Sequence, residues 1–69
     1  MENLKLGNKI KRYRTEQKIT QSELGELVGV TRKTINTVEN NVFVPSALLA
    51  FKLAKALNLK VETLFYLTK

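Results

Sequence analysis

The sequence predicts one all-α domain of five helices over residues 1–69, and three observations support this prediction. Apolar residues recur three and four positions apart through most of the chain, which is the spacing of one helix face. A hydroxyl side chain that can cap a helix precedes three of these segments. With only three Gly and one Pro, the chain offers no linker or repeat at which to divide it.

The first helix is expected because Leu6, Ile10 and Tyr13 recur at steps of four and three, which places them on one buried stripe. Many of the basic residues spread around the rest of this segment, so a basic amphipathic helix that binds a membrane or a partner protein is a rival interpretation. The alternation of Leu4 and Leu6 also allows the two ends of the chain to pair as short strands.

The second helix begins at a capping box, in which the Thr20 hydroxyl accepts from the Glu23 amide and the Glu23 carboxylate accepts from the Thr20 amide. Its expected inward face consists of Leu24, Leu27 and Val28. Gly29 can take the left-handed conformation that ends a helix. This helix is therefore only about two turns long.

Two further hydroxyl caps, Thr31 and Ser46, predict the third and fourth helices. The third helix has a buried stripe of Ile35 and Val38 and ends at residues 40–41, where two Asn can tolerate a positive φ. The fourth, expected at the centre of the core, has the broad apolar face Leu49, Ala50, Leu53, Ala54 and Leu57. Beyond Asn58, a short fifth helix is expected from the spacing of Val61, Leu64 and Phe65.

Composition excludes several classes of function. Without Cys or His, the chain has no disulfide framework, no zinc or iron site, and none of the usual nucleophile and base pairs, so we expect neither an enzyme nor a cofactor. The longest apolar run covers only residues 47–51, and the N-terminal segment carries an acid and no long apolar stretch. We therefore expect no membrane span and no secretion leader, which favours a cytoplasmic location.

The charge balance is basic, with 12 Lys and Arg against 6 Asp and Glu, a net charge of +6. This value suits either a nucleic-acid partner or ordinary solubility. Two short helices joined by a Gly-containing turn indicate a helix-turn-helix over residues 21–40, whose second helix enters the DNA major groove. The motif requires a small residue at Gly25, Gly at position 29, and five apolar residues, Leu24, Val28, Val30, Ile35 and Val38, and all are present.

At these residues the sequence resembles the lambda repressor and Cro family, the xenobiotic-response-element type of regulator. The matching motifs are Thr-Gln-Ser-Glu-Leu at 20–24, a Gly turn and Val-Thr-Arg-Lys-Thr-Ile-Asn at 29–36, Glu-Asn at 39–40, and Pro-Ser before an Ala- and Leu-rich helix at 45–57. The resemblance covers nearly the whole chain, whose length is similar to that of the stand-alone dimeric repressors of the family. The chain departs from the family pattern at Gly25, Asn41, Val42 and Lys60, where Ala, Gly, Lys and a capping hydroxyl are commoner.

The resemblance implies three sets of site residues. The base-reading residues are Arg32, Lys33, Asn36 and Thr37. Arg or Lys can donate to guanine, Asn can pair bidentately with adenine, and a short Thr can touch a thymine methyl. The residues that contact phosphate are Gln21, Thr31, Thr34 and Asn40. A structural salt bridge between Arg14 and Glu39 fixes the recognition helix, the alternative for Arg14 being a phosphate contact.

We therefore expect a sequence-specific repressor that binds a near-palindromic site on double-stranded DNA as a homodimer, with no small-molecule effector evident. Apolar residues left after the core is assigned are the expected dimer interface: Leu59, Phe65, Tyr66 and Leu67, with Phe43 in reserve. The alternative is that they complete each protomer's core, and the apolar loop at residues 42–44 likewise packs on the core or contacts a second subunit. Other candidate functions are a protein-interaction module, such as an antitoxin or adaptor, and RNA binding, which the few aromatic residues disfavour.

Overall fold

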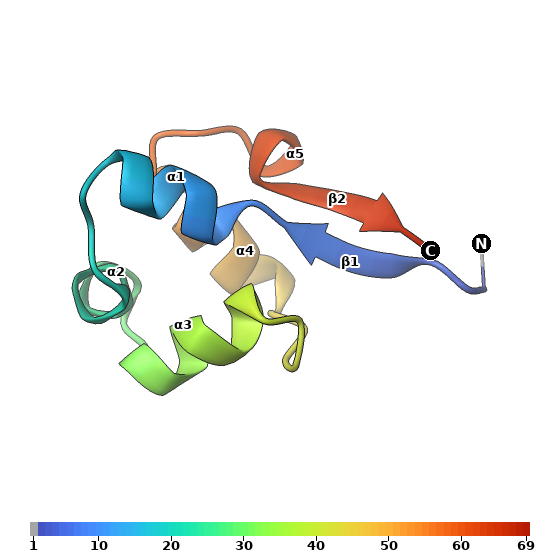
Figure 1. The fold of residues 1–69 in the computed structure, drawn as a ribbon, viewed down its shortest axis with the longest axis horizontal. Helices are drawn as coiled ribbons and strands as arrows, with labels where there is room; N and C mark the ends of the chain where they lie inside the picture. Colours follow the sequence, from blue (N-terminus) through green and yellow to red (C-terminus); the bar gives the residue numbers. More distant parts are fainter. Residues whose placement is uncertain (1) are drawn as a thin grey trace.

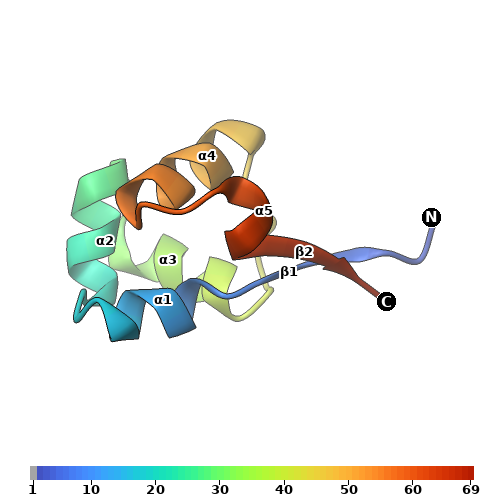
Figure 2. The same cartoon turned by 90° about the horizontal axis from the view of Figure 1, so that it is seen from above.

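The computed structural model describes residues 2–69, and its elements follow the order β1, five helices, β2 (Figure 1). The strands are β1 (Lys5–Asn8) and β2 (Phe65–Thr68), and the helices are α1 (Ile10–Glu16), α2 (Gln21–Val28), α3 (Arg32–Glu39), α4 (Ala47–Ala56) and α5 (Val61–Leu64). The helices gather in one body, and the two-stranded sheet extends from it (Figures 1 and 2). Within residues 2–69, no helix has both the length and the apolar character needed to cross a membrane.

The two ends of the chain pair as antiparallel strands, with Leu6 opposite Leu67 and Gly7 opposite Tyr66. The five predicted helices are present, so the fold is mostly helical with a small sheet. The expectation that Leu6 belongs to the first helix is wrong, because that helix begins at Ile10 and Leu6 lies in β1. Likewise, Phe65 begins β2 and does not continue α5.

The Tyr66 ring on β2 lies directly over Gly7 of β1. A Cβ atom added to Gly7 would lie 2.5 Å from a carbon of that ring. The Lys9 ammonium nitrogen lies 5.8 Å from the centroid of the same ring, on the chain segment that follows β1. Tyr66 is therefore held by contacts within the protomer, although it remains 45% exposed.

The core draws on all five helices and the start of β2. Its buried members are Ile10, Leu24, Val28, Ile35, Val38, Leu49, Leu53, Ala54, Leu57, Leu64 and Phe65. The expected face of α4 is largely correct, with Ala50 only half-buried. Leu27 was wrongly expected to point inward and is 64% exposed, because α2 buries the residues four apart, Leu24 and Val28.

The predicted caps set the helix boundaries. Thr20 and Glu23 form the reciprocal capping box. The Glu23 backbone N–H donates to the Thr20 hydroxyl over 3.0 Å, and the Thr20 backbone N–H donates to the Glu23 carboxylate over 2.9 Å. The hydrogen bond from the Thr20 backbone N–H, with a second contribution from the Thr20 side chain, lowers the pKa of Glu23 below its ordinary value of 4.5. Gly29 and Asn41 take the expected positive φ values of 79° and 61° after α2 and α3.

Candidate nucleic-acid interface

Helices α2 and α3 form a compact pair joined by a turn at residues 29–31. The backbone N–H of Val30 donates to the Gly25 carbonyl over 2.9 Å, which draws the turn against α2. A Cβ atom at Gly25 would lie 2.6 Å from the Val30 carbonyl oxygen. Glycine in a helix is less favourable than Ala by about 1 kcal/mol of helix stability, but at this position it allows the close approach of the turn.

The outward face of α3 carries three of the four expected base-reading residues. Arg32, Lys33 and Asn36 are exposed. Among residues 2–69, neither Arg32 nor Lys33 forms a salt bridge or a side-chain hydrogen bond. Thr37 differs, because it is half-buried and its hydroxyl donates to the Thr34 carbonyl over 2.9 Å. Arg32 and Lys33 are thus the cationic donors that α3 offers to an acceptor outside the protein.

Arg14 and Glu39 form a bidentate ion pair that joins α1 to the end of α3. Arg14 Nε lies 2.7 Å from Glu39 Oε2, and Arg14 Nη2 donates to Glu39 Oε1 over 3.2 Å. The side chains are 10% and 3% exposed, and Arg14 Nη1 also donates to the Ile19 carbonyl. Burial leaves Arg14 without the exposure that the alternative phosphate contact would require.

Gln21, expected to contact phosphate, is half-buried at the start of α2 and its side-chain amide is turned toward α3. Its Nε2 donates to Glu39 Oε1 over 3.0 Å and to Asn36 Oδ1 over 3.2 Å. Both hydrogens of the amide are therefore used within the protein. Sequence reasoning missed this link, because the family pattern implied only a phosphate contact for Gln21 and paired Glu39 with Arg14.

The other expected phosphate residues also make hydrogen bonds within the protein. Thr31 Oγ1 accepts from the Thr34 backbone N–H over 3.2 Å and shares a hydrogen bond with Thr34 Oγ1. Asn40 Nδ2 donates to the carbonyl oxygen of Asn36 over 2.9 Å and to its Oδ1 over 3.1 Å. Thr31 and Asn40 are nonetheless exposed, and the first backbone N–H groups of α2 and α3 have no partner within the helix.

The four expected dimer residues have different environments. Phe65 is 6% exposed and completes the protomer's own core, which was the alternative for this residue. Leu59 is half-buried, whereas Tyr66 and Leu67 are exposed on β2. The loop at residues 42–44 is also exposed, with 78%, 48% and 69% of its residues' surfaces accessible, so it does not pack into the core.

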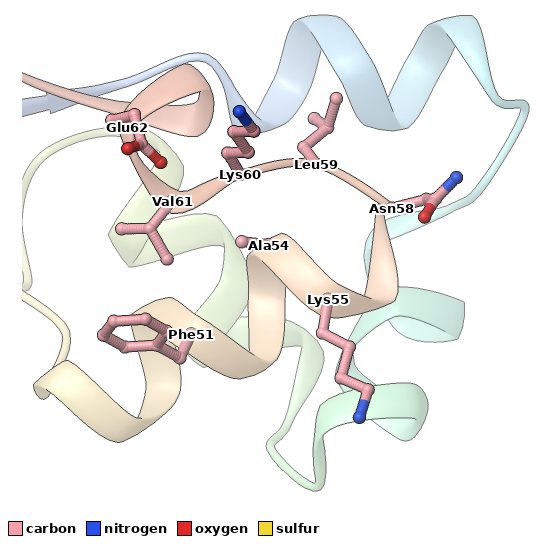
Figure 3. Close-up of a pocket in the computed structure, with 8 residues that line it drawn as sticks. All are labelled: Phe51, Ala54, Lys55, Asn58, Leu59, Lys60, Val61 and Glu62. Atoms are coloured by element: carbon pink, nitrogen blue, oxygen red, sulfur yellow. The ribbon is translucent and has the colours of Figure 1, made fainter.

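An open groove of about 880 Å³ runs between α4 and the segment that leads into α5 (Figure 3). Its lining residues are Phe51, Ala54, Lys55, Asn58, Leu59, Lys60, Val61 and Glu62. Phe51 is 63% exposed on one side of the groove, and Val61 points toward α4 from the other side. The groove thus combines an exposed aromatic ring with charges of both signs.

Comparison with known proteins gives a consistent family. A family model described as helix-turn-helix matches residues 10–64. The chain is 47% identical over 60 residues to YgzD of Bacillus subtilis, an uncharacterized HTH-type transcriptional regulator, covering 87% of this chain and 91% of that protein. It is 43% identical over 58 residues to MJ0272 of Methanocaldococcus jannaschii, which bears the same description, covering 84% and 88% of the two chains.

Two solved structures share the arrangement of the chain. The P22 c2 repressor protein, in a crystal structure with synthetic operator 9T, superposes with a TM-score of 0.74 at 32% identity and covers 77% of this chain and 80% of its own. The N-terminal DNA binding domain of SinR from Bacillus subtilis superposes with a TM-score of 0.71 at 34% identity, over 78% and 80% of the two chains.

Proposed function

The chain belongs to the helix-turn-helix family of the lambda repressor type, a family of DNA-binding transcription regulators, and from this premise we propose that it is a homodimeric repressor. In this proposal it acts in the cytoplasm and binds a near-palindromic operator through the major groove. The observation that carries the proposal is the outward face of α3, where exposed Arg32, Lys33 and Asn36 lie on a helix anchored by the buried Arg14–Glu39 pair.

In this proposal, side chains of α3 read the bases, and the N-terminal ends of α2 and α3 contact the DNA backbone. Arg32 and Lys33 have no internal partner among the described residues, so each can donate to guanine O6 and N7 without breaking a bond in the protein. The unpaired N–H groups at the start of α2 and α3 suit phosphate oxygens, with the exposed side chain of Thr31 at the start of α3. Asn40, at the end of α3, uses both of its amide hydrogens on Asn36, so its side chain has none to donate to a phosphate. The net charge of +6 supplies the sequence-independent attraction.

Repression is proposed because the chain is similar to a repressor of known structure and because α3 exposes side chains suited to bind DNA. One similar structure is the P22 c2 repressor in complex with a synthetic operator, and the superposition covers 80% of that repressor chain. A protein that occupies an operator can repress by its presence alone, so the proposal requires only DNA binding. One helix-turn-helix contacts few base pairs, and useful specificity needs two units about one helical turn apart.

We place the dimer interface at the groove that contains Leu59, with Phe51 as its anchor. An exposed aromatic ring in an apolar hollow is the usual centre of a protein contact, surrounded by a polar rim. Lys55, Lys60 and Glu62 supply that rim with both signs of charge, which suits a two-fold contact in which one patch meets a copy of itself. Tyr66 is less suited, because its ring already covers Gly7.

Selection of bound duplexes from a random DNA pool, followed by sequencing, tests the proposed function. We expect an enriched motif made of two related half-sites in inverted orientation. If the folded protein enriches no motif, sequence-specific DNA binding is wrong, and the alternative of a protein-interaction module is favoured. An enriched single half-site would retain DNA binding and remove the palindromic operator.

Analytical ultracentrifugation of paired variants tests the interface. Phe51→Glu places a charge in the groove and is expected to give a monomer, whereas Leu67→Asp, a matched charge on the exposed side of β2, leaves the dimer intact. Dissociation by Leu67→Asp alone would move the interface to the sheet. A wild type that is monomeric at micromolar concentration and still covers a full palindrome cooperatively would show that DNA, and not this groove, assembles the pair.

A further inference from the structure

A chain of polar side chains leads from the buried ion pair to the DNA-facing surface of α3. It runs from Arg14 to Glu39, then to Gln21, and ends at Asn36. Each link limits how the next side chain can be oriented. Arg14 only donates hydrogen bonds and the Glu39 carboxylate only accepts them, so the amide that meets Glu39 Oε1 must present its nitrogen.

Gln21 satisfies this requirement with Nε2, 3.0 Å from Glu39 Oε1. The same nitrogen lies 3.2 Å from Asn36 Oδ1, so its second hydrogen meets an acceptor. If the Gln21 amide were reversed, its oxygen would face the Glu39 carboxylate, which has no hydrogen to donate. The ion pair therefore determines which atom Gln21 presents to Asn36.

Asn40 restrains Asn36 from the other side by the same logic. Its Nδ2 lies 2.9 Å from the Asn36 backbone carbonyl, a group that only accepts, and 3.1 Å from Asn36 Oδ1. Asn36 Oδ1 thus accepts two hydrogen bonds, which fills both of its lone pairs. A reversed Asn36 would place its NH2 group against two donors.

We propose that Gln21 and Asn40 are positioning residues that make Asn36 a hydrogen-bond donor toward DNA. Asn36 Nδ2 has no partner within residues 2–69, and the side chain is exposed. Bidentate pairing with adenine needs both a free amide oxygen and a free NH2, and the oxygen is occupied. Guanine offers two acceptors, O6 and N7, to an NH2 group, so the position read by Asn36 favours guanine over adenine.

This inference rests on the proposed function, and it changes the role expected of Gln21. With both of its amide hydrogens used, the side chain has none to donate to a phosphate. Its contribution to DNA binding passes through Asn36, and only its backbone N–H at the start of α2 remains suited to phosphate.

Sequencing of DNA selected from a random pool tests the inference on five proteins: wild type, Asn36→Ala, Gln21→Leu, Asn40→Ala and the Gln21→Leu/Asn40→Ala double variant. The base position whose preference disappears in Asn36→Ala identifies the one that Asn36 reads. We expect wild type to prefer guanine over adenine there by about fivefold or more, and the double variant to shift toward adenine because Oδ1 is released. Each single variant gives a smaller shift in the same direction.

Gln17→Leu is the matched control, because Gln17 Nε2 donates to the Leu57 carbonyl over 2.8 Å, an equivalent amide bond outside the network. It is expected to lower the melting temperature without moving the base preference. Strong preference for adenine in wild type, or an unchanged preference in the double variant, overturns the inference while specific binding stands. Loss of all enrichment in wild type refutes the proposed function as well. Base preference is measured only on folded protein. If the double variant or one single variant unfolds, the preference of the single variant that remains folded is compared with that of wild type.

Discussion

Replacement of Arg14 by Met is expected to be among the most destabilising changes in this protein, because it leaves a buried carboxylate without its cation. The Glu39 side chain is 3% exposed and, among residues 2–69, would keep only the Gln21 amide as a donor. The Ile19 carbonyl also loses its bond to Arg14 Nη1. Breaking a buried pair by removing one partner costs about 3–5 kcal/mol.

The size of the domain makes this cost decisive. A core in a chain of this length rarely supplies more than about 3–5 kcal/mol of net stability, so Arg14→Met is expected to unfold a large share of the molecules. A loss of about 3 kcal/mol lowers the melting temperature by at least about 12 °C at the sensitivity of small domains. The double variant Arg14→Met/Glu39→Leu removes both charges and is expected to lose only about 1–3 kcal/mol, chiefly from the Ile19 carbonyl.

The assay is urea unfolding followed by circular dichroism, with an excluded osmolyte added equally to all samples so that the single variants have a folded baseline. Wild type, Arg14→Met, Glu39→Leu and the double variant form a cycle. We expect the double variant to be more stable than either single variant. If the losses add to within about 0.5 kcal/mol, the two side chains do not interact and the anchoring of α3 by this pair is refuted.

Three further predictions concern the surface and the caps. Arg32→Ala and Lys33→Ala should each weaken binding to the selected site by about 1–3 kcal/mol with little change in melting temperature, and equal losses on random DNA would remove them from base reading. The logarithm of the wild-type affinity should fall linearly with that of salt concentration, by about 0.9 per phosphate neutralised, and a flat response would exclude phosphate contacts. Because folding lowers the pKa of Glu23 from 4.5, the stability contributed by its ionised carboxylate is present above pH 4.5 and is lost as the pH falls through the lowered pKa. The difference in melting temperature between wild type and Glu23→Ala should therefore become smaller in acid.

The fold was predictable wherever a local signal determines it. The capping box at Thr20 and the left-handed Gly29 depend on residues within one helix, and both features occur as the sequence predicts. The start of the first helix was missed because Leu6 and Ile10 are four apart, a spacing that a strand followed by a helix can also produce. Asn8 marks the true boundary, since its Oδ1 accepts from the Ile10 N–H over 3.1 Å.

The site was predictable only in part, because its side chains meet across helices. The sequence alone left Arg14 and Glu39 as charged residues of no stated partner, and the family pattern supplied the pairing that the structure contains. No pattern supplied the contact of Gln21 with Asn36, because 15 positions separate them and the contact depends on how α2 crosses α3. A polar residue at a helix start is compatible with a cap, a phosphate contact or a bond to the next helix, and only the tertiary arrangement decides among these.

The polar side chains of α3 consequently fall into two groups with different consequences for specificity. Arg32 and Lys33 have no internal partner in the part of the chain that the structure describes, so we expect their replacement to change the proposed DNA-contacting surface without changing how α3 is held. Asn36 is bonded to Gln21 and Asn40, and through Gln21 to the buried ion pair. Under the proposed function, we therefore expect a new base preference at the Asn36 position to require compensating changes in α2 and at the end of α3, whereas one at Arg32 or Lys33 would require a single substitution.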